Sequence, residues 1–485
     1  MEKGFATMYR ILVEGDRRLA LAVTIALSLA AGLVAGAYVA ILSPIYALAV
    51  ALALTAGLLM LRDIQWGFFA LIGLICLLPF GTFPFQIGFT PTFLDVALVA
   101  IYLVWLLRIA TGQAGRLVAT ALGLPTVIFL FLACASFVAG LAHAPLTPYL
   151  LRHFAEILLS ISLFFTIVNC VHSREQLQRL IMVLMWAGFG AAAIGVFLYF
   201  LPQEWSIRLL SALGRVGYPT GSGVLRFIED DPSLPQRAIS TSTDPNVLGG
   251  LLILITTLTA AQLFACKPLL FRPIVAGMVL VEVTCLYLTY SRGSMLGLAV
   301  GLGVLALVRY RKLILLMVGA AFLILLLPQT QEYVRHFIEG IRLQDLATLM
   351  RLGEYKDAIL LIRRHPWIGV GFAGTPESSL YLGVSNVYLL IAEEMGLIGF
   401  AVFVTILILF FGQVWSAWSR VRQHHELEAI LLGLVGSIAG ILVGGLLDHY
   451  FFNLNFPHSV AIFWFYLGLT MTTLRLITED RTGPQ

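Results

Sequence analysis

Four short motifs after residue 236 hold residues that could bind or process an anion. The first is Arg237 followed by STDPNVLGG, in which Asp244 precedes Pro245 and Asn246. This order is typical of a helix start, because the residue before proline avoids the helical region and proline suits the first helical position. Alone, the motif predicts an ordinary N-cap. With Arg237 beside it, the helix N-terminus is also a candidate phosphate site.

The second and third motifs place arginines at the edges of apolar runs. Arg292 lies in YSRGSMLGL, where it either extends to the membrane surface or contacts an anion from the protein interior. Arg351 opens RLGEYKDAILLIRRHPWIGVGFAG, in which residues 351–364 are predicted to form an amphipathic helix whose apolar face consists of Leu352, Ala358, Ile359, Leu361 and Ile362. Tyr355 follows Arg351 by one turn. A guanidinium fork matches phosphate oxygens, so both arginines are candidate anion ligands.

The fourth motif, SNVYLLIAEEMGLIG, places acidic residues inside an apolar run. Glu393 and Glu394 follow Asn386 by about two helical turns. A charge at such a position is costly unless it is paired or protonated. These glutamates are therefore predicted either to form an ion pair with one of the arginines or to supply a catalytic carboxylate. The glycines of WIGVGFAG, just before this motif, predict close approach of the backbone to a ligand.

The remaining candidates are histidines near the end of the chain. His449 and His458, with Asp448, stand at the ends of the last two apolar runs, where a capping or interfacial role is expected. The sequence contains no zinc-type spacing, P-loop or nucleic-acid-binding motif. We therefore expect neither a metal nor a cofactor.

The elements that must position these residues are predicted to be membrane-spanning helices. The 485 residues are 60% hydrophobic and 12% charged, against roughly 25% charged in soluble domains, which excludes a water-soluble fold. Long unbroken apolar runs also exclude a transmembrane β-barrel. The fold class is therefore all-α and polytopic, with about fourteen spans. They are expected near 18–38, 41–61, 66–80, 93–110, 118–141, 150–171, 178–201, 246–266, 273–290, 294–309, 313–328, 386–412, 428–447 and 459–475.

The charged loops predict the orientation of the chain. Arginines before the first run predict a retained signal anchor with a cytoplasmic N-terminus, and every short basic loop then lies on the cytoplasmic side. Both termini are predicted to be cytoplasmic. Two long segments, 202–245 and 329–385, fall on the opposite side and hold nine arginines but one lysine. These arginines either bind an anion or form a solvated surface with nearby carboxylates.

The domain organisation is predicted to be simple. Composition does not change enough anywhere to mark a separate soluble domain, so 1–485 is expected to be one membrane domain with two outer segments, 202–245 and 329–385, that contain short amphipathic helices. No internal repeat is evident, which weighs against a transporter built from inverted repeats.

Together, the four motifs resemble those of the O-antigen ligase and polymerase family of bacterial polytopic membrane glycosyltransferases. The resemblance runs from about Arg237 to Gly399. It consists of Asp244-Pro245-Asn246, Ser291-Arg292-Gly293, Arg351 followed by His365-Pro366 and Gly369-Val370-Gly371, and Asn386 to Gly396.

The resemblance implies transfer of a glycan from an undecaprenyl-pyrophosphate donor to an acceptor sugar hydroxyl, at the outer face of the bacterial plasma membrane and without a metal. The arginines would hold the pyrophosphate and stabilise the charge that grows on it as it leaves. The expected donor-binding residues are Arg237, Arg292, Arg351, Asp244, Asn246, Tyr355 and Asn386. Candidate partners are a glycan or lipid A core acceptor, membrane lipids, a flippase and a chain-length regulator, and no nucleic acid.

The resemblance does not supply the general base, because many members have a His-Asn pair where this chain has Ser385-Asn386. Substitutes are Glu394, His365 and Glu377. The missing histidine favours a polymerase of lipid-linked repeat units over a ligase acting on lipid A core. Two other classes stay open: a lipid-linked oligosaccharide flippase or other transporter, and a non-catalytic membrane partner in a polysaccharide assembly complex.

Overall fold

The computed structural model describes residues 55–86, 88–113, 115–326, 331, 334–335, 338, 342, 346–374 and 383–479. The predicted span at 18–38, most of the one at 41–61 and the candidate base Glu377 lie outside the described residues. The chain divides into two units, Met1–Trp66 and Gly67–Gln485. The candidate site residues that the structure describes belong to the second unit.

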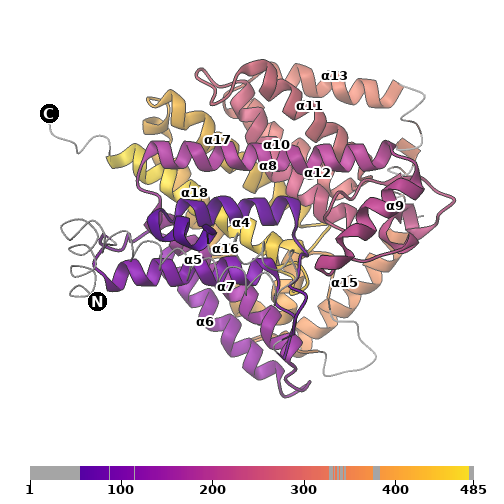
Figure 1. Cartoon of the computed structure of the whole chain (residues 1–485), viewed down its shortest axis with the longest axis horizontal. Helices are drawn as coiled ribbons and strands as arrows, with labels where there is room; N and C mark the ends of the chain where they lie inside the picture. Colours follow the sequence, from indigo (N-terminus) through magenta and orange to yellow (C-terminus); the bar gives the residue numbers. More distant parts are fainter. Residues whose placement is uncertain are drawn as a thin grey trace, which may run out of the picture. The chain divides into compact units, whose positions relative to one another are not determined.

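The described part of the chain is mostly helical, and each predicted span from 66–80 onward falls on a helix (Figure 1). Eight described helices are long and apolar enough to cross a membrane: α5 (Phe93–Ala110), α6 (Gly123–Gly140), α7 (Pro148–Cys170), α8 (Arg174–Phe200), α10 (Pro245–Leu263), α16 (Val387–Val421), α17 (His425–Gly444) and α18 (Pro457–Glu479). Shorter helices occupy the other predicted spans: α4 (Gln65–Leu77), α11 (Arg272–Leu288), α12 (Arg292–Val308) and α13 (Lys312–Leu326). An all-α, multi-pass membrane protein is confirmed, whereas the count of fourteen spans stays a prediction.

The centre of the second unit is built around α10. This helix packs against α8, α11, α12 and α17, and α18 packs against α7 and α17. Glycines let α12 and α17 approach closely, because a Cβ at Gly297 would lie 2.7 Å from the carbonyl oxygen of Gly440, and one at Gly301 would lie 3.0 Å from that of Gly436. These contacts rigidly fix the start of α12, where Arg292 lies.

The two long segments predicted to lie outside the membrane contain structure of their own. The first holds α9 (Gln203–Ala212) and a two-stranded antiparallel sheet, β1 (Arg226–Phe227) and β2 (Gln236–Arg237), in which Arg226 pairs with Arg237. Short 3₁₀ turns at Leu213–Val216, Ser222–Val224 and Ile228–Asp230 link these elements. The second holds α15 (Leu346–Arg364), a helix that covers the predicted range 351–364 and begins five residues earlier. Figure 1 shows α9 and α15 at the same end of the unit.

Helix α16 is broken at Gly396, which has φ 67°. The segment after α15 fills the break: Val370 N donates to Glu393 O at 2.9 Å, and Leu397 N donates to Pro366 O at 2.7 Å. The glycines of WIGVGFAG therefore allow close backbone contact, as expected, but the partner is protein. A Cβ at Gly369 would lie 2.5 Å from the carbonyl oxygen of Glu394. The residues around Glu394 are held by this inserted segment.

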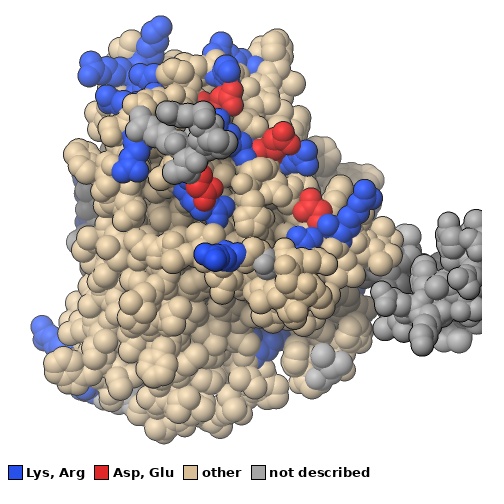
Figure 2. Space-filling model, turned by 90° about the vertical axis from the view of Figure 1, so that its left-hand side faces the viewer, with Lys and Arg blue, Asp and Glu red and all other residues tan. Residues whose placement is uncertain are grey.

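Figure 2 shows one face of the molecule, on which most of the visible Lys and Arg side chains lie in the upper part, with fewer acidic side chains among them. Ion pairs join the loops that are predicted to be cytoplasmic: Lys267 Nζ lies 2.9 Å from Glu426 Oε1, and Arg309 Nε lies 3.1 Å from Glu428 Oε1. The distribution fits the positive-inside pattern, and the orientation itself stays a prediction.

Candidate functional site

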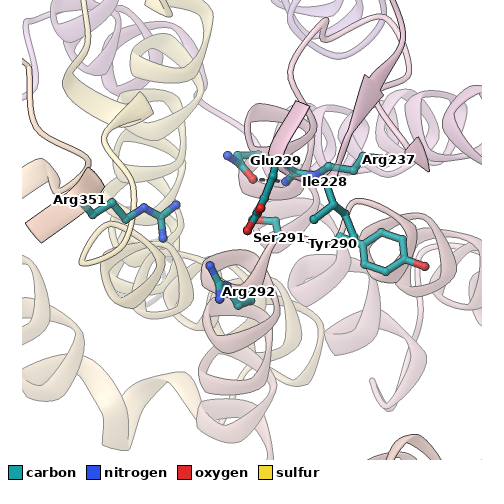
Figure 3. A pocket seen from close by; sticks show the side chains of 8 residues that line it. Ile228, Glu229, Arg237, Tyr290, Ser291, Arg292 and Arg351 are labelled. Atoms are coloured by element: carbon teal, nitrogen blue, oxygen red, sulfur yellow. Dashed lines mark hydrogen bonds between the residues drawn. The ribbon is translucent and has the colours of Figure 1, made fainter. Parts of the chain in front are cut away.

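The three arginines singled out from the sequence line one small pocket, which we call the arginine pocket. It encloses about 90 Å³ and is lined by Ile228, Glu229, Arg237, Asn246, Tyr290, Ser291, Arg292 and Arg351. Figure 3 shows Arg351 entering from one side and Arg292 from below, while the Tyr290 ring points away. With three guanidinium groups and one carboxylate, the lining carries net positive charge. Ligand clefts usually enclose about 300–1,000 Å³, so this pocket fits an anionic group better than a sugar chain.

Arg237 is held by neutral acceptors. Its Nε donates to the carbonyl oxygen of Thr289 at 2.7 Å, and its Nη2 donates to Asn246 Oδ1. Burial lowers the pKa of Arg237 from its ordinary value, and nearby Asp244 opposes this shift. A carbonyl and an amide orient a guanidinium without cancelling its charge, so that charge remains to attract an anion.

Asp244 acts as the predicted N-cap of α10. Its Oδ1 accepts from the backbone N–H groups of Asn246 at 2.7 Å and Val247 at 3.0 Å. Asp244 therefore fixes the helix start from which Asn246 reaches Arg237. The structure supports a positioning role for Asp244 and places Asn246 in the pocket lining.

Arg292 opens α12, directly after the N-cap residue Ser291. The preceding Tyr290 has φ 52°, and positive φ angles also occur at Glu229, Ser240 and Thr243, all in the segments around the pocket. Such conformations cost of order 1–3 kcal/mol each and persist only where the surrounding structure enforces them. These positive φ angles therefore indicate that tertiary contacts hold the backbone around the pocket in its conformation.

Arg351 reaches the pocket from α15, and Tyr355 anchors that helix. The Tyr355 hydroxyl donates to the carbonyl oxygens of Leu446 at 3.0 Å and Ser385 at 3.3 Å. Asn386 caps α16 by accepting from the backbone N–H of Tyr388 at 3.0 Å, and its Nδ2 donates to the same Leu446 oxygen at 2.9 Å. Tyr355 and Asn386 thus join α15 and α16 to the segment after α17, beside the pocket.

The segment after α17 adds charged neighbours that sequence reasoning treated as capping or interfacial. Asp448 interacts electrostatically with Arg237 and Arg351. Burial raises the pKa of Asp448 to about 7, although Arg351 opposes the shift. Burial also lowers the pKa of His449, whose charged neighbours include Glu354 and Arg351. A histidine with a lowered pKa is neutral at pH 7 and can accept a proton.

Glu394 lines a different cavity of about 370 Å³, which we call the Glu394 pocket. Glu394 is 5% exposed, and its Oε2 has no hydrogen-bond partner among the described residues. The other lining residues are Ala144, Pro145, Thr147, Tyr149, Leu150, His153, Phe372, Ala373, Gly383, Leu390, Asn453, Leu454 and Asn455. The structure therefore separates this candidate base from the lining of the arginine pocket.

The other two candidate bases are not placed in either lining. His365 follows α15 and packs beside His143, with ring centroids 5.8 Å apart. Glu377 lies outside the described residues. Among the residues that the structure describes, no group of three or more His, Cys, Asp or Glu is arranged to hold a metal ion.

Comparison with known families gives one match. The family model described as O-antigen ligase matches residues 277–404, a range that contains Arg292, Arg351 and Glu394 but not Arg237. A search of curated proteins finds no match. The family match confirms the resemblance inferred from the motifs and supports a glycosyltransferase-type membrane enzyme. This chain is a multi-pass membrane protein in which residues 277–404 are similar to the O-antigen ligase family.

Proposed function

We propose that this protein transfers a glycan from an undecaprenyl-pyrophosphate donor to an acceptor sugar hydroxyl at the outer face of a bacterial plasma membrane. The observation that carries the proposal is the convergence of Arg237, Arg292 and Arg351 from three separate elements on one pocket. Two of the three lie inside the region that matches the O-antigen ligase family.

The pocket suits the charge that changes during such a reaction. The acceptor oxygen attacks the anomeric carbon, the bond from that carbon to the pyrophosphate oxygen breaks, and the electron pair leaves with the pyrophosphate. Arginines already oriented toward the leaving group stabilise the charge that develops on it. Because Arg237 is tied to neutral acceptors, its orientation is fixed before the donor binds.

The acceptor hydroxyl must also lose a proton, and His449 is our candidate base. It stands on the segment that Tyr355 and Asn386 contact, and Arg351 is among its charged neighbours. Its lowered pKa keeps the imidazole neutral, so it can take the proton at pH 7.

The pH profile of transfer tests this assignment. We expect activity to fall on the acid side only below about pH 6.5, because His449 must then become protonated, and His449→Gln to remove most activity while donor binding persists. An acid limb unchanged in His449→Gln excludes His449 as the base.

Polymerisation of lipid-linked repeat units is our first choice of reaction, because Ser385 stands where many relatives carry a histidine. Ligation to lipid A core is the second, because the matched family model is described as O-antigen ligase.

Incubating the purified protein with undecaprenyl-pyrophosphate-linked repeat units, with and without lipid A core, separates these reactions. Ladders on the donor lipid indicate a polymerase, and a single addition to lipid A core indicates a ligase. If neither product forms in either mixture, the proposed enzyme activity is rejected. A flippase or a non-catalytic assembly partner is then the remaining function.

A further inference from the structure

We propose that the Glu394 pocket binds an uncharged sugar residue of the acceptor, apart from the arginine pocket. The assignment of this sugar to the acceptor rests on the proposed function, whereas sugar binding itself can be tested without any transfer reaction. The lining is rich in the groups that recognise sugar hydroxyls: two amides, a phenol, an imidazole and a carboxylate.

The carboxyl group of Glu394 lacks a hydrogen-bond partner. Its buried Oε2 has none among the described residues, and a buried polar atom left unsatisfied is costly. The backbone around it cannot shift easily, because the carbonyl oxygen of Glu394 accepts from Gly371 N at 3.0 Å and from Ser136 Oγ. A ligand hydroxyl in the adjoining cavity would supply the missing partner, because a hydroxyl can both donate and accept.

The amides on the opposite segment supply donors to the ligand. Asn455 Oδ1 accepts from the Tyr149 hydroxyl at 3.0 Å, and Asn453 Oδ1 accepts from the backbone N–H of Asn455 at 2.7 Å. The side-chain NH₂ groups of both asparagines have no hydrogen bond to the described residues. With both amide oxygens occupied, these NH₂ groups remain for hydroxyl oxygens. The cavity thus combines donors on one wall with an acceptor on another, as a polyol requires.

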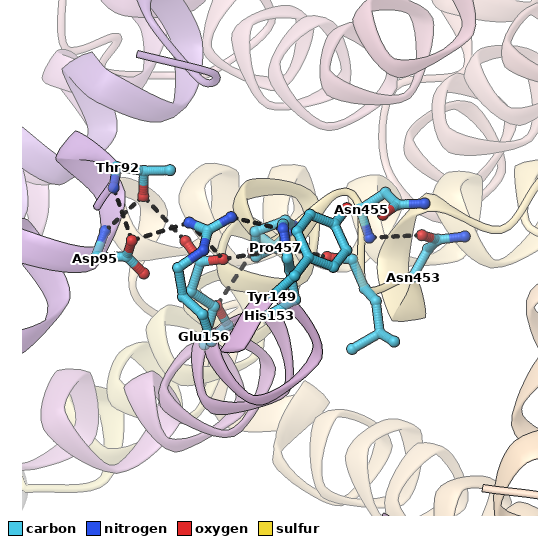
Figure 4. Close-up of polar contacts among 11 residues, drawn as sticks. Thr92, Asp95, Tyr149, His153, Glu156, Asn453, Asn455 and Pro457 are labelled. Atoms are coloured by element: carbon cyan, nitrogen blue, oxygen red, sulfur yellow. Dashed lines mark hydrogen bonds and ion pairs between the residues drawn. The ribbon is translucent and has the colours of Figure 1, made fainter. Parts of the chain in front are cut away.

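The charge around this cavity disfavours an anion. The nearby Arg152 lies in an ion-paired network, with Nη1 at 3.0 Å from Asp95 Oδ2 and 3.5 Å from Glu156 Oε2, and Thr92 Oγ1 donates to Glu156 Oε1 at 3.0 Å. Figure 4 shows these contacts running from Thr92 and Asp95 toward His153 and the two asparagines. The carboxylate of Asp95 therefore balances the charge of this arginine.

His153 is also fixed as a neutral group. Arg152 Nη2 lies 2.6 Å from His153 Nε2 and has only hydrogens to offer, so Nε2 must accept. The other ring nitrogen, Nδ1, then donates to the carbonyl oxygen of Leu454 at 2.9 Å. An imidazole that accepts at Nε2 is not cationic. No arginine or lysine is among the described lining residues of this cavity, whereas three arginines line the arginine pocket.

Saturation-transfer NMR on the full-length protein in nanodiscs tests sugar binding directly, with lactose and N,N′-diacetylchitobiose as probes. We expect at least one disaccharide to give a signal that Asn455→Ala and Glu394→Leu reduce at least tenfold. Arg351→Ala should leave the signal intact. Asn169→Ala and Glu282→Leu, which remove an amide and a buried carboxylate elsewhere, are matched controls. No signal from either probe, or signals equal in all variants, overturns the proposal.

A second measurement assigns the sugar to the acceptor. With saturating donor, Glu394→Leu and Asn455→Ala should raise the acceptor KM at least tenfold and leave binding of glycan-free undecaprenyl pyrophosphate unchanged. A lost kcat with intact disaccharide binding would make Glu394 a catalytic base instead and reject a binding role. If wild type transfers nothing but the NMR result holds, the sugar site stands and the proposed function fails.

Discussion

The arginine pocket and the Glu394 pocket use arginine in opposite ways. In the first, Arg237 is held by a carbonyl oxygen and an amide oxygen, so its positive charge is left for a ligand. Beside the second, Arg152 is held by Asp95 and Glu156, so its charge is cancelled within the protein. The comparison indicates that the partners of an arginine, more than its presence, determine whether its charge remains available to an anion.

The sharpest test of this comparison is removal of an arginine from the first pocket. We expect Arg351→Ala to reduce glycan transfer by about 100-fold or more, because a preorganised group that stabilises the leaving charge is lost. Arg351→Lys should recover only part of the activity, since an ammonium cannot form the paired hydrogen bonds of a guanidinium. Transfer from the lipid-linked donor, measured by gel, gives the rates. Full activity in Arg351→Ala would show that the pocket does not hold the donor.

Removal of the compensated arginine should act on folding. Arg152 is 12% exposed in its side chain and pairs with Asp95 and the buried Glu156. We expect Arg152→Met to destabilise the protein by about 3–5 kcal/mol, because the partly buried carboxylate of Asp95 loses its cation and Glu156 loses a polar partner. Thermal unfolding followed by size-exclusion chromatography measures the loss, with Arg351→Met as the matched control. Equal stability of the two variants would contradict the conclusion that Arg152 is paired for stability and Arg351 is not.

Features that depend on local sequence could be predicted well. The run expected at 93–110 coincides with α5, and the amphipathic helix expected at 351–364 lies within α15, because hydropathy and helical periodicity are local properties. The motif resemblance selected Arg237, Arg292 and Arg351, which share one pocket although the sequence spacing alone does not bring them together.

Features that depend on tertiary contacts were missed. His153 received no role, because its partners Arg152 and Leu454 are joined only by the packing of α7 against the start of α18. His449 was expected to be interfacial, because its approach to Arg351 depends on contacts with the segment after α17. A single sequence carries no local signal for either arrangement.

The break in α16 gives a way to disturb the Glu394 pocket alone. A Cβ at Gly396 would lie 2.3 Å from the carbonyl oxygen of Trp367, and φ there is 67°. We expect Gly396→Ala to destabilise the protein by about 2–4 kcal/mol through backbone strain and displacement of the inserted segment. Gly412→Ala in the same helix, which has open space, should change stability by less than about 0.5 kcal/mol.

Ligand binding to Gly396→Ala, measured at a temperature where the variant stays folded, tests whether the substitution affects one pocket or both. Disaccharide binding should weaken, because the backbone of Glu394 moves, while undecaprenyl-pyrophosphate binding should stay within about twofold of wild type. An equal loss of disaccharide binding and undecaprenyl-pyrophosphate binding would indicate that the two pockets are structurally coupled.

The last test concerns Asp448, the carboxyl beside the arginine pocket whose pKa is raised by burial to about 7. In the unfolded chain this group titrates near its ordinary value of 3.8, so between these pH values the folded protein holds the extra proton. Its contribution to the free energy of unfolding therefore falls as pH rises, with a slope of at most about 1.4 kcal/mol per pH unit. Asp448→Asn does not titrate, so its melting temperature relative to wild type should rise by a few degrees between pH 4 and 7. A constant difference over this range would mean that Asp448 is solvated, and the arginine pocket would then be more open to water than its contacts indicate.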